Sequence, residues 1–511
     1  MPTFAAVDIG ANSVRLKIAR LVRQHLRLVH QDREVTRLGE SVFRTGALDP
    51  HAMEHTIKVL RRFHRTCQGH GVDSVRVVAT SALRDSRNSR AFVDWVRAVT
   101  GWRVEVISGL EEGRLIHLGV ISGTRIAVSR LLLIDLGGGS CELTLSVDGQ
   151  IRSVFSLPVG AVRLTQEFLH HDPPKSSELK QMREFVVEEL TRVERQIARA
   201  RIQLAIATSG TAAALASVVA TRRRSPRKVN TGIVSRRAVR ALAAELPNYS
   251  LEQRVAIPGI GPRRAEIIVA GAMVFGELMN HGVSGFRYSP LGLRDGLLAQ
   301  MVAEYGHGTR ARQQIESERS NALLEVGKHY RVDLRFATHV CNLSIQLFSG
   351  LKKVHGLPPE YQDWLTAAAM LHEVGFYLNR TGRHRHTYYI VSNSEIFGYT
   401  NQQRHLIAAI ARYMGKTLPD VADRALKPLS VKDRQLVPKA IALLRLARAL
   451  DHGRRGAVSG VRTEIKDGQI ILRLETKRGG ADLERWALGK ERGYFRTIFG
   501  RELLPIAAAS A

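Results

Sequence analysis

The chain has 511 residues, which suits about three domains of ordinary size. Hydrophobic residues make up 44% of it and charged residues 24%, a composition that supports packed cores and excludes disorder for most of the chain. The formal net charge of +29 favours a polyanionic partner, such as polyphosphate, a nucleotide, nucleic acid or an acidic membrane surface.

The sequence predicts a cytoplasmic protein. Its three cysteines are far apart and form no CxxC pair, which argues against a disulfide scaffold or a structural zinc site. No apolar run reaches the roughly 18 residues of a membrane span, so we expect no membrane contact through a helix. The first residues lack the basic and apolar regions of a secretory signal.

Short β-rich runs and longer helical segments alternate over the first 300 residues. Apolar or alternating runs bounded by turn residues predict strands, and segments that begin with Pro or Ser predict helices. In the first part we expect strands at Phe4–Ile9, Val14–Leu21 and Leu26–Leu38, then helices at Pro50–Gly69 and Ser89–Val99. In the second part we expect strands at Leu131–Leu136, Glu142–Val147 and Ile151–Leu157, then a helix at Ser176–Ala200.

An internal duplication relates these two parts. Asp8 and Asp135 are separated by 127 positions (135 minus 8), and the Gly and Ser residues that follow them match in register. Thr80 and Thr208 match at nearly the same offset, 128 (208 minus 80). Generic strand-and-turn segments are the alternative explanation. We predict two α/β domains, residues 1–125 and 126–306.

Each copy places an Asp at the end of a strand, before a turn that contains glycine and serine. Glycine lets backbone N–H groups approach a ligand closely, and successive N–H groups bind anions. The Asp beside the turn suits a hard cation such as Mg²⁺. Two such turns facing each other would form a phosphate clamp, whereas a single one would only close a hairpin.

Other residues fit this chemistry, with structural alternatives. Arg15 of the first copy corresponds to Glu142 of the second, an acid suited to a metal or a water, or a strand residue free to vary. Thr80–Arg84 and Ser209–Thr211 each follow a strand and begin a helix, where they bind an anion or cap the helix. Glu111 and Glu112 begin another helix, where acids are commonly dipole partners.

These motifs occur together and in order, and the chain resembles the exopolyphosphatase/guanosine-pentaphosphate phosphohydrolase family, within the actin and sugar-kinase superfamily. The motifs that carry the resemblance are Val7–Ser13, Ala79–Arg84, Ile107–Leu115, Ile134–Glu142, Ala207–Thr211 and Leu291–Gly296. The resemblance implies an α/β fold with duplicated actin-like (ribonuclease H-like) domains, followed by an all-α HD-like domain and a small α/β cap.

The resemblance also implies residue roles. Glu112 would be the general base, and Asp135 and Glu142 would position Mg²⁺ and the attacking water, with Asp8 as a further metal ligand. The phosphates would be held by Gly10, Asn12, Ser13, Arg84, Gly137, Gly138, Gly139, Ser140, Ser209, Gly210 and Thr211. Ala11 and Cys141 depart from the Ser and Thr that are frequent in the family.

The carboxy-terminal third is strongly helical, and we expect an HD-like domain at 307–455 and a cap at 456–511 with strands in 460–474 and a helix at 483–503. The HD resemblance rests on His339, His372, Glu373, His384, His386, His405 and Asp451. Because Glu373 replaces the usual Asp, we expect no independent metal site here. Arg380 and Arg383–His386 would line a path for polyphosphate or form an ordinary charged loop.

Two segments suggest nucleic acid, which we consider a weaker interpretation. Ile257–Ala265 resembles a DNA-binding helix-hairpin-helix turn, but we interpret it as the entry to a helix. Arg222–Lys228 resembles a basic nucleic-acid-binding patch, but we interpret it as an exposed loop.

The sequence therefore predicts an Mg²⁺-dependent exopolyphosphatase that releases orthophosphate from inorganic polyphosphate, with guanosine pentaphosphate as second substrate. The sequence does not fix the oligomeric state, and the resemblance implies a homodimer. Both substrates end in the same phosphoanhydride, so the sequence does not rank them. A kinase of the same superfamily and a non-catalytic polyanion-binding protein are the alternatives.

Overall fold

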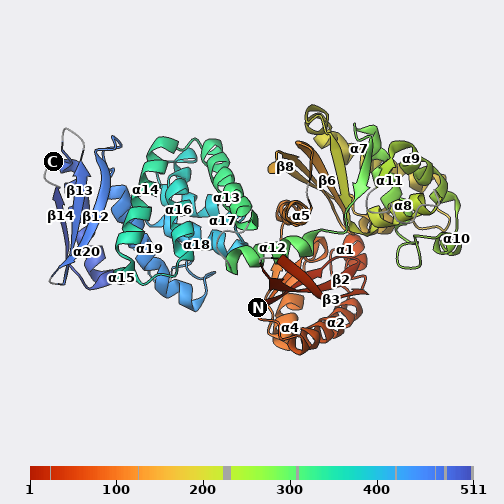
Figure 1. The fold of residues 1–511 in the computed structure, drawn as a ribbon, viewed down its shortest axis with the longest axis horizontal. Helices are drawn as coiled ribbons and strands as arrows, with labels where there is room; N and C mark the ends of the chain where they lie inside the picture. Colours follow the sequence, from red (N-terminus) through yellow and green to blue (C-terminus); the bar gives the residue numbers. More distant parts are fainter. Residues whose placement is uncertain are drawn as a thin grey trace. The chain divides into compact units, whose positions relative to one another are not determined.

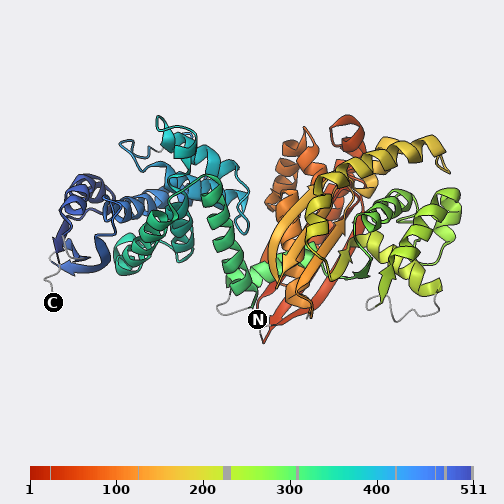
Figure 2. The same cartoon turned by 90° about the horizontal axis from the view of Figure 1, so that it is seen from above.

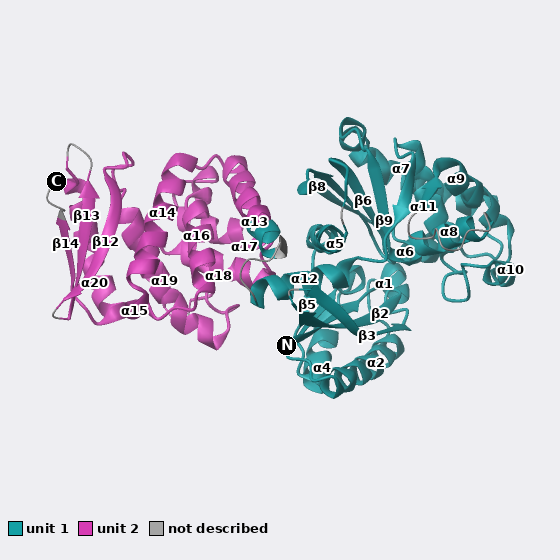
Figure 3. Ribbon diagram, viewed as in Figure 1, with its two compact units in different colours: residues 1–316 teal, residues 317–511 magenta. Residues whose placement is uncertain are grey.

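The chain mixes helices and strands (Figure 1 and Figure 2). The computed structural model describes residues 1–23, 25–124, 126–222, 232–305, 310–420, 423–466, 468–476 and 480–507. They form two compact units, a first unit of residues 1–316 and a second unit of residues 317–511 (Figure 3). The division into four domains stays a prediction. Every helix in the described part of the chain is too short or too polar to cross a membrane.

The first sheet of the first unit has the strand order β3-β2-β1-β4-β5. β1 pairs antiparallel with β2 and parallel with β4. The bounds are β1 Thr3–Ile9, β2 Ser13–Val22, β3 His25–Val35, β4 Ser74–Ala79 and β5 Val104–Val106. β3 ends before the predicted Leu38 because the N–H groups of Thr36 and Arg37 donate to the Asn12 carbonyl, and Arg37 adopts a left-handed φ of 51°.

The second sheet repeats this plan, which confirms the duplication. Its order is β10-β11-β9-β6-β7-β8, so β6, β7, β8 and β9 occupy the places that β1, β2, β3 and β4 have in the first sheet. β6 likewise pairs antiparallel with β7 and parallel with β9. The bounds are β6 Arg130–Leu136, β7 Cys141–Val147, β8 Gln150–Leu157, β9 Leu204–Thr208, β10 Ile233–Ser235 and β11 Gly285–Tyr288.

Helices cover both faces of each sheet. On the first sheet, Ala5 and Val7 pack against α2 (Pro50–Gly69) and α4 (Ser89–Thr100). Phe4 and Ala6, which alternate with them, pack on the opposite face against α12 (Leu293–Tyr305). Figure 1 shows α2 and α4 on one side of this sheet and α12 on the other. We call the first sheet with α1–α4 the first lobe.

In the second sheet, Leu131 and Leu133 pack against α5 (Gly109–Gly123). The alternate residues Leu132 and Ile134 face a larger core. That core is covered by α7 Ser176–Arg199, α8 Ser209–Arg222, α9 Arg236–Glu245 and α11 Ile268–Asn280. We call the second sheet with α6–α11 the second lobe.

The remaining helices of the first unit are short. They are α1 Glu40–Thr45, α3 Ser81–Asp85, α6 Ala161–Phe168, the 3₁₀ helix η2 Leu246–Asn248 and α10 Leu251–Ala256. The segment from Ile257 forms turns that lead into α11, as predicted for a helix entry. The predicted basic loop at Arg222–Lys228 lies, apart from Arg222, outside the described residues.

The second unit has one hydrophobic core shared by its helices and its small sheet. Leu343, Ile441, Leu472 and Phe495 all belong to it. The helices are α13 Arg310–His329, which begins in the first unit, then α14 Leu334–Gly350, α15 Lys352–His355, α16 Glu360–Leu371, η3 Val374–Tyr377, α17 Arg383–Asn393, α18 Asn401–Arg412 and α19 Val431–Ala449. The end of the chain forms β12 Val458–Lys466, β13 Gln469–Thr476, α20 Asp482–Phe499 and β14 Leu503–Ala507.

The last strand was not predicted. α20 stops at Gly500, whose φ of 66° ends the helix, rather than continuing to Leu503. The residues that follow form β14, which pairs parallel with β13.

α5 and α12 are in backbone contact in the first unit. A Cβ at Gly296 of α12 would lie 1.8 Å from the Leu115 carbonyl oxygen of α5, and one at Gly119 would lie 2.6 Å from the Gly292 carbonyl oxygen. Only glycine permits this approach. The buried Arg114 guanidinium reinforces it by donating to Glu111, 2.8 Å away, and to Gln300 of α12, 2.6 Å away.

Gly296→Ala should therefore destabilise the protein, since its methyl group would overlap backbone that has no room to move. We expect the free energy of unfolding to fall by about 1–3 kcal/mol in urea titrations. The matched control is Gly489→Ala in α20, where a Cβ meets nothing within 4 Å and helix propensity favours Ala by about 1 kcal/mol. Equal stability of the two variants would contradict the close packing of α5 and α12.

Candidate functional site

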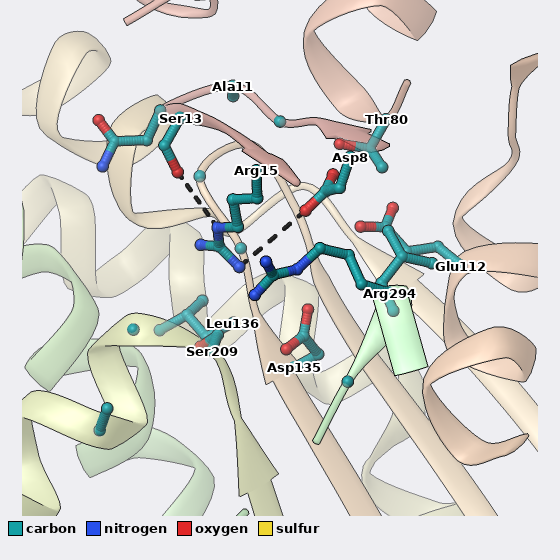
Figure 4. Close-up of a pocket in the computed structure, with 18 of the residues that line it drawn as sticks. Asp8, Ala11, Ser13, Arg15, Thr80, Glu112, Asp135, Leu136, Ser209 and Arg294 are labelled. Atoms are coloured by element: carbon teal, nitrogen blue, oxygen red, sulfur yellow. Dashed lines mark hydrogen bonds and ion pairs between the residues drawn. The ribbon is translucent and has the colours of Figure 1, made fainter. Parts of the chain in front are cut away.

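A polar cavity of about 230 Å³ lies in the first unit where the two duplicated turns meet (Figure 4). Its wall combines residues from both lobes and from the start of α12. The predicted site residues on this wall are Asp8, Gly10, Asn12, Ser13, Glu112, Asp135, Gly137, Gly138, Ser140, Ser209 and Gly210. The fold thus brings together residues that are up to about two hundred positions apart in the chain.

The two turns have the same backbone hydrogen bond and touch each other. The Gly10 N–H donates to the Ser13 carbonyl at 3.2 Å, and the Gly137 N–H donates to the Ser140 carbonyl at 2.9 Å. A Cβ at Gly138 would lie 3.0 Å from the Ala11 Cβ and 3.3 Å from the Asn12 nitrogen. The turns are therefore in contact with each other and both line the cavity, which suits a clamp for one anion.

The hairpins that carry the turns differ in charge. In the first lobe Asp8 is opposite Arg15, whose guanidinium is 4.0 Å from the Asp8 carboxylate. In the second lobe Asp135 is opposite Glu142. Like charges directly across a strand pair are destabilising unless something compensates them. At the position that the duplication singled out, Arg15 of the first lobe therefore completes a neutral pair. Glu142 of the second lobe completes a pair of acids that suits a bound cation.

A third carboxylate, that of Glu112, lies beside this second pair. Ligand oxygens of Glu112, Asp135 and Glu142 all lie within 4.8 Å of one another. Glu112 comes from the first turn of α5, where Ser108 caps the helix. Asp8, predicted as a further metal ligand, is not in this group and pairs with Arg15 instead (Figure 4).

Burial and mutual repulsion raise the pKa values of these acids. The pKa of Glu112 is raised well above its usual value by burial and by the nearby Glu142, although the Arg84 guanidinium opposes the shift. Burial and Asp135 raise the pKa of Glu142 to about 7. Burial also raises the pKa of Asp135, which accepts a hydrogen bond from the Thr208 hydroxyl.

Two of the carboxylate oxygens are left unsatisfied. Among the described residues, Glu112 Oε2 and Glu142 Oε2 are buried and have no hydrogen-bond partner. The other oxygen of Glu142 accepts from the Ser156 hydroxyl at 2.8 Å. Buried carboxylate oxygens without a hydrogen-bond partner, in a group of three neighbouring acids, match the oxygen ligands that Mg²⁺ prefers.

Four predicted residues stand behind the cavity wall rather than on it. Arg84 is turned toward the Ile107 carbonyl, 2.9 Å away, and the Glu112 carboxylate, 3.7 Å away, so it neighbours the expected base. Gly139 packs where a Cβ would meet Ser81 and Phe43, and Glu142 is buried. Thr211 is fully buried beside Gly271. The phosphate-binding roles of Arg84, Gly139 and Thr211 stay predictions.

Ser209 is strained in a way that favours a ligand role. It follows β9 with a left-handed φ of 75°, which is uncommon for serine. Within the described part of the chain its hydroxyl is buried without a hydrogen-bond partner. Figure 4 shows Ser209 beside Leu136 and Asp135 in the cavity wall. Strained residues with unused donors cluster at binding sites.

Four arginines line the cavity that were not among the predicted site residues: Arg15, Arg33, Arg264 and Arg294. Burial and the neighbouring arginines lower the pKa of Arg33 to about 10 and that of Arg264 to about 9. Gly210 makes room for one of them, since a Cβ there would lie 1.7 Å from the Arg264 guanidinium. Mutually repelling buried guanidinium groups suit an anion with several negative charges.

Some sequence signals could have found these arginines. Arg15 was singled out by the duplication, and Arg264 and Arg294 belong to quoted motifs, whereas nothing in the local pattern distinguishes Arg33. Arg294 also fixes the start of α12 by donating to the Leu16 carbonyl at 3.0 Å.

The second unit shows what surrounds its HD-like residues. Glu373 is ion-paired with Arg454, whose guanidinium lies over the Phe336 ring. His339 Nε2 lies 2.9 Å from the Val458 carbonyl oxygen, and Asp451 accepts from the Gly456 N–H at 2.8 Å. In the described ranges, the only set of three His, Cys, Asp or Glu able to share an ion is Glu112, Asp135 and Glu142.

The cavity can therefore hold a multiply charged anion between the two turns and the arginines, and a divalent cation among the acids. A buried acid with a raised pKa lies next to both, which is where a general base for an attacking water would be needed.

Comparisons with known proteins agree with this chemistry. The model of the Ppx/GppA phosphatase family matches residues 17–305, and that of domain III of the same family matches residues 319–492. A guanosine-5'-triphosphate,3'-diphosphate pyrophosphatase from Aliivibrio fischeri is 24% identical over 457 residues, covering 89% of this chain and 87% of the relative.

Two solved structures resemble the chain as well. The Ppx/GppA family member of Aquifex aeolicus is 30% identical with a TM-score of 0.52, over 60% of this chain and 99% of that one. An exopolyphosphatase from Cytophaga hutchinsonii is 25% identical with a TM-score of 0.56, over 60% of this chain and 100% of that one. The two family models together span most of the chain, which belongs to the Ppx/GppA phosphatase family.

Proposed function

We propose that the protein is an Mg²⁺-dependent exopolyphosphatase that hydrolyses the terminal phosphoanhydride of inorganic polyphosphate to orthophosphate. Guanosine pentaphosphate is the proposed second substrate, because it ends in the same bond and because a curated relative is named for that activity. The observation that carries the proposal is the buried Glu112 carboxylate, grouped with Asp135 and Glu142 beside the two facing turns.

Binding would use the two turns and the arginines. N–H groups of both turns would hold the terminal phosphate, and the ring of Arg15, Arg33, Arg264 and Arg294 would neutralise the phosphates behind it. These groups are fixed in place before the substrate arrives, so they stabilise the charge that spreads over the phosphate oxygens during transfer.

Glu112 would act as the general base. It orients a water for in-line attack and accepts its proton, while the new oxygen–phosphorus bond forms and the bond to the bridging oxygen breaks. The shortened chain leaves with the charge of that oxygen. The Arg84 guanidinium, 3.7 Å from the Glu112 carboxylate, opposes the rise in the pKa of Glu112 that burial causes.

Mg²⁺ fits the residues present. Asp135 and Glu142 would hold it, because their like charges face each other and Glu142 keeps an unpartnered oxygen. When bound, Mg²⁺ would supply charge neutralisation for the phosphate oxygens. Asp8 as a further ligand stays a prediction.

The proposal also covers the fold of the individual lobes, the helical part of the second unit, the localisation and the oligomeric state. We propose that the two lobes are actin-like domains, that the helical part of the second unit is HD-like with Arg454 supplying the positive charge at Glu373, and that the enzyme is cytoplasmic and dimeric. The role of Arg380 and Arg383–His386 in guiding polyphosphate stays a prediction.

Glu112→Gln should abolish turnover while binding persists. The amide keeps the shape of the side chain but cannot accept the proton, so we expect kcat to fall by about 10²–10⁴-fold on both substrates. Phosphate release and polyphosphate binding are the two measurements. Glu184→Gln, at an exposed ion pair on α7, is the control and should retain wild-type kcat. A wild-type rate in Glu112→Gln would remove Glu112 from the role of base.

Glu142→Gln should stabilise the metal-free protein, and increasingly so as the pH rises. Burial raises the pKa of Glu142 to about 7 in the folded state, whereas its value in an unfolded chain is about 4.3. Folded wild type therefore holds a proton between these values that the unfolded chain has lost, and its stability falls as pH rises through this window.

In urea unfolding with EDTA, we expect the free energy of unfolding of the variant to rise relative to that of wild type. The rise should reach up to about 3 kcal/mol between pH 4 and pH 8. With excess MgCl₂ the difference should shrink or reverse, because wild type then gains the free energy of cation binding. A difference that is the same at all pH values and with either additive would contradict the buried acidic pair as a cation site.

Gly210→Ala should weaken substrate binding through Arg264. The new methyl group would displace the Arg264 guanidinium from the cavity wall, so the variant should behave like Arg264→Met. We expect each to raise KM about tenfold, as for the loss of one charge-assisted contact, and the double variant to be no worse than either alone. Additive effects would show that Gly210 and Arg264 act separately.

A further inference from the structure

The second glycine turn is held from behind by α6. The N–H groups of Ala161 and Val162 at the start of this helix donate to the carbonyls of Gly137, at 3.0 Å, and Gly138, at 2.8 Å. The Arg163 side chain binds the next carbonyl, since its Nε donates a hydrogen bond to the Gly139 carbonyl at 2.8 Å. Three successive carbonyls of the turn are therefore fixed on the α6 side.

Fixing these carbonyls also aims the N–H groups of the turn. In a trans peptide the N–H points opposite to the preceding carbonyl, and these peptides are trans. The N–H groups of Gly138, Gly139 and Ser140 therefore point away from α6. The direction of the Ser140 N–H depends on a side chain, because it shares a peptide with the Gly139 carbonyl, which accepts from Arg163.

Arg163 also connects the two lobes. Its Nη2 forms an ion pair with Asp85 of α3, and its guanidinium lies over the Phe43 ring of α1, 4.2 Å from the centroid. Both partners belong to the first lobe, whereas Arg163 and Gly139 belong to the second. The Arg163 side chain is only 16% exposed, so these contacts form in partly desolvated surroundings.

The same contact reaches the neighbourhood of Glu112. Asp85 lies between two arginines, with Arg84 Nε 4.0 Å from its carboxylate on the other side. Arg84 in turn is 3.7 Å from the Glu112 carboxylate. A chain of charged groups thus leads from the second turn through Arg163, Asp85 and Arg84 to the proposed base.

In the described ranges of the chain, no side chain holds a carbonyl of the first turn in this way. Its Ala11 and Asn12 carbonyls are held by backbone N–H groups alone, those of Gly39, Thr36 and Arg37. The third residue after the capping glycine is Val42 in α1 and Arg163 in α6. The guanidinium contact is therefore specific to the lobe that carries Asp135 and Glu142.

We propose that Arg163 is a positioning residue that couples the contact between the two lobes to the orientation of the second phosphate-binding turn. Arg163 is not part of the cavity wall or of the group formed by Glu112, Asp135 and Glu142. It acts through Gly139 and Asp85. With the guanidinium in place, both turns present their N–H groups to one phosphoryl group at the same time. Without it, the Gly139 carbonyl loses its side-chain donor, and the Ser140 N–H of the same peptide loses its fixed direction. This inference rests on the proposed function, because it assigns the turn to phosphate.

The test is Arg163→Met, which keeps an unbranched apolar side chain near Phe43 but removes every hydrogen bond. We expect kcat per folded molecule to fall about 10- to 100-fold, as for other small displacements of groups around a transition state, with KM little changed. Arg163→Lys, which retains a charge for Asp85, should recover part of the loss. Arg183→Met, which breaks the ion pair of Arg183 with Glu277 in the same lobe, is the control and should keep wild-type kcat.

Hydrogen exchange provides a readout that needs no turnover. Amides of residues 137–143 should exchange faster in Arg163→Met than in wild type or Arg183→Met. If wild type releases phosphate and Arg163→Met keeps its kcat and its exchange, the positioning role is wrong while the proposed function stands. If wild type releases no phosphate, the proposed function is wrong, and the exchange of residues 137–143 still decides whether Arg163 orders the turn.

A second variant covers the case in which Arg163→Met does not fold. Asp85→Asn removes the interlobe ion pair from the exposed side and leaves Gly139 and its arginine partner in place. A fall in kcat with unchanged melting temperature supports the coupling. An unchanged kcat in folded Asp85→Asn contradicts it.

Discussion

The buried repulsion between Asp135 and Glu142 is the constraint on which the site depends. Two carboxylates face each other across one hairpin, a third from α5 completes the group, and burial raises the pKa of each. Such a group is costly in a folded protein unless a cation or protons neutralise it. The first lobe shows the neutral alternative, since Arg15 occupies the position of Glu142 and pairs with Asp8.

The fold keeps this group in position through its duplicated architecture. Each sheet has an Asp at the next-to-last position of one strand, followed by a glycine turn, and α5 and α12 lie against both sheets. Glycines at the helix crossing let the backbones touch, so Glu112 at the start of α5 has a fixed distance to both turns. Four arginines and the acids Asp8, Glu112 and Asp135 then line the same cavity.

Sequence pattern predicted the parts of this architecture that are local. Strands β1, β2 and β6 and helix α2 follow from alternation and capping residues within one segment, and the duplication follows from short motifs repeated at one offset. The end of β3 depends on the Asn12 carbonyl, which lies far from Val35 in the chain, so local pattern could not place it. β14 was missed because a five-residue strand directly after a helix has little periodicity of its own.

The sequence motifs were most informative for the site residues that lie in or beside the glycine turns. Asp8, Asp135, Glu112 and the glycines on the cavity wall belong to the predicted motifs. The arginines on β2, β3, α12 and the loop before α11 were not assigned to the site, although only Arg33 lies outside every quoted motif or repeat. Among 76 Lys and Arg residues no single one is distinctive, and only the folded chain shows which of them converge. Thr211 shows the opposite case, since its motif matches but its side chain is turned into the core.

Hydrolysis of polyphosphate in ¹⁸O-labelled water with Mg²⁺ present tests whether a water attacks the terminal phosphorus. If the acids prepare a water that attacks the terminal phosphorus between the two turns, each orthophosphate released should carry one oxygen from the solvent, and the chains should shorten from their ends. Orthophosphate without solvent oxygen, or chains cut internally into short fragments, would contradict the account.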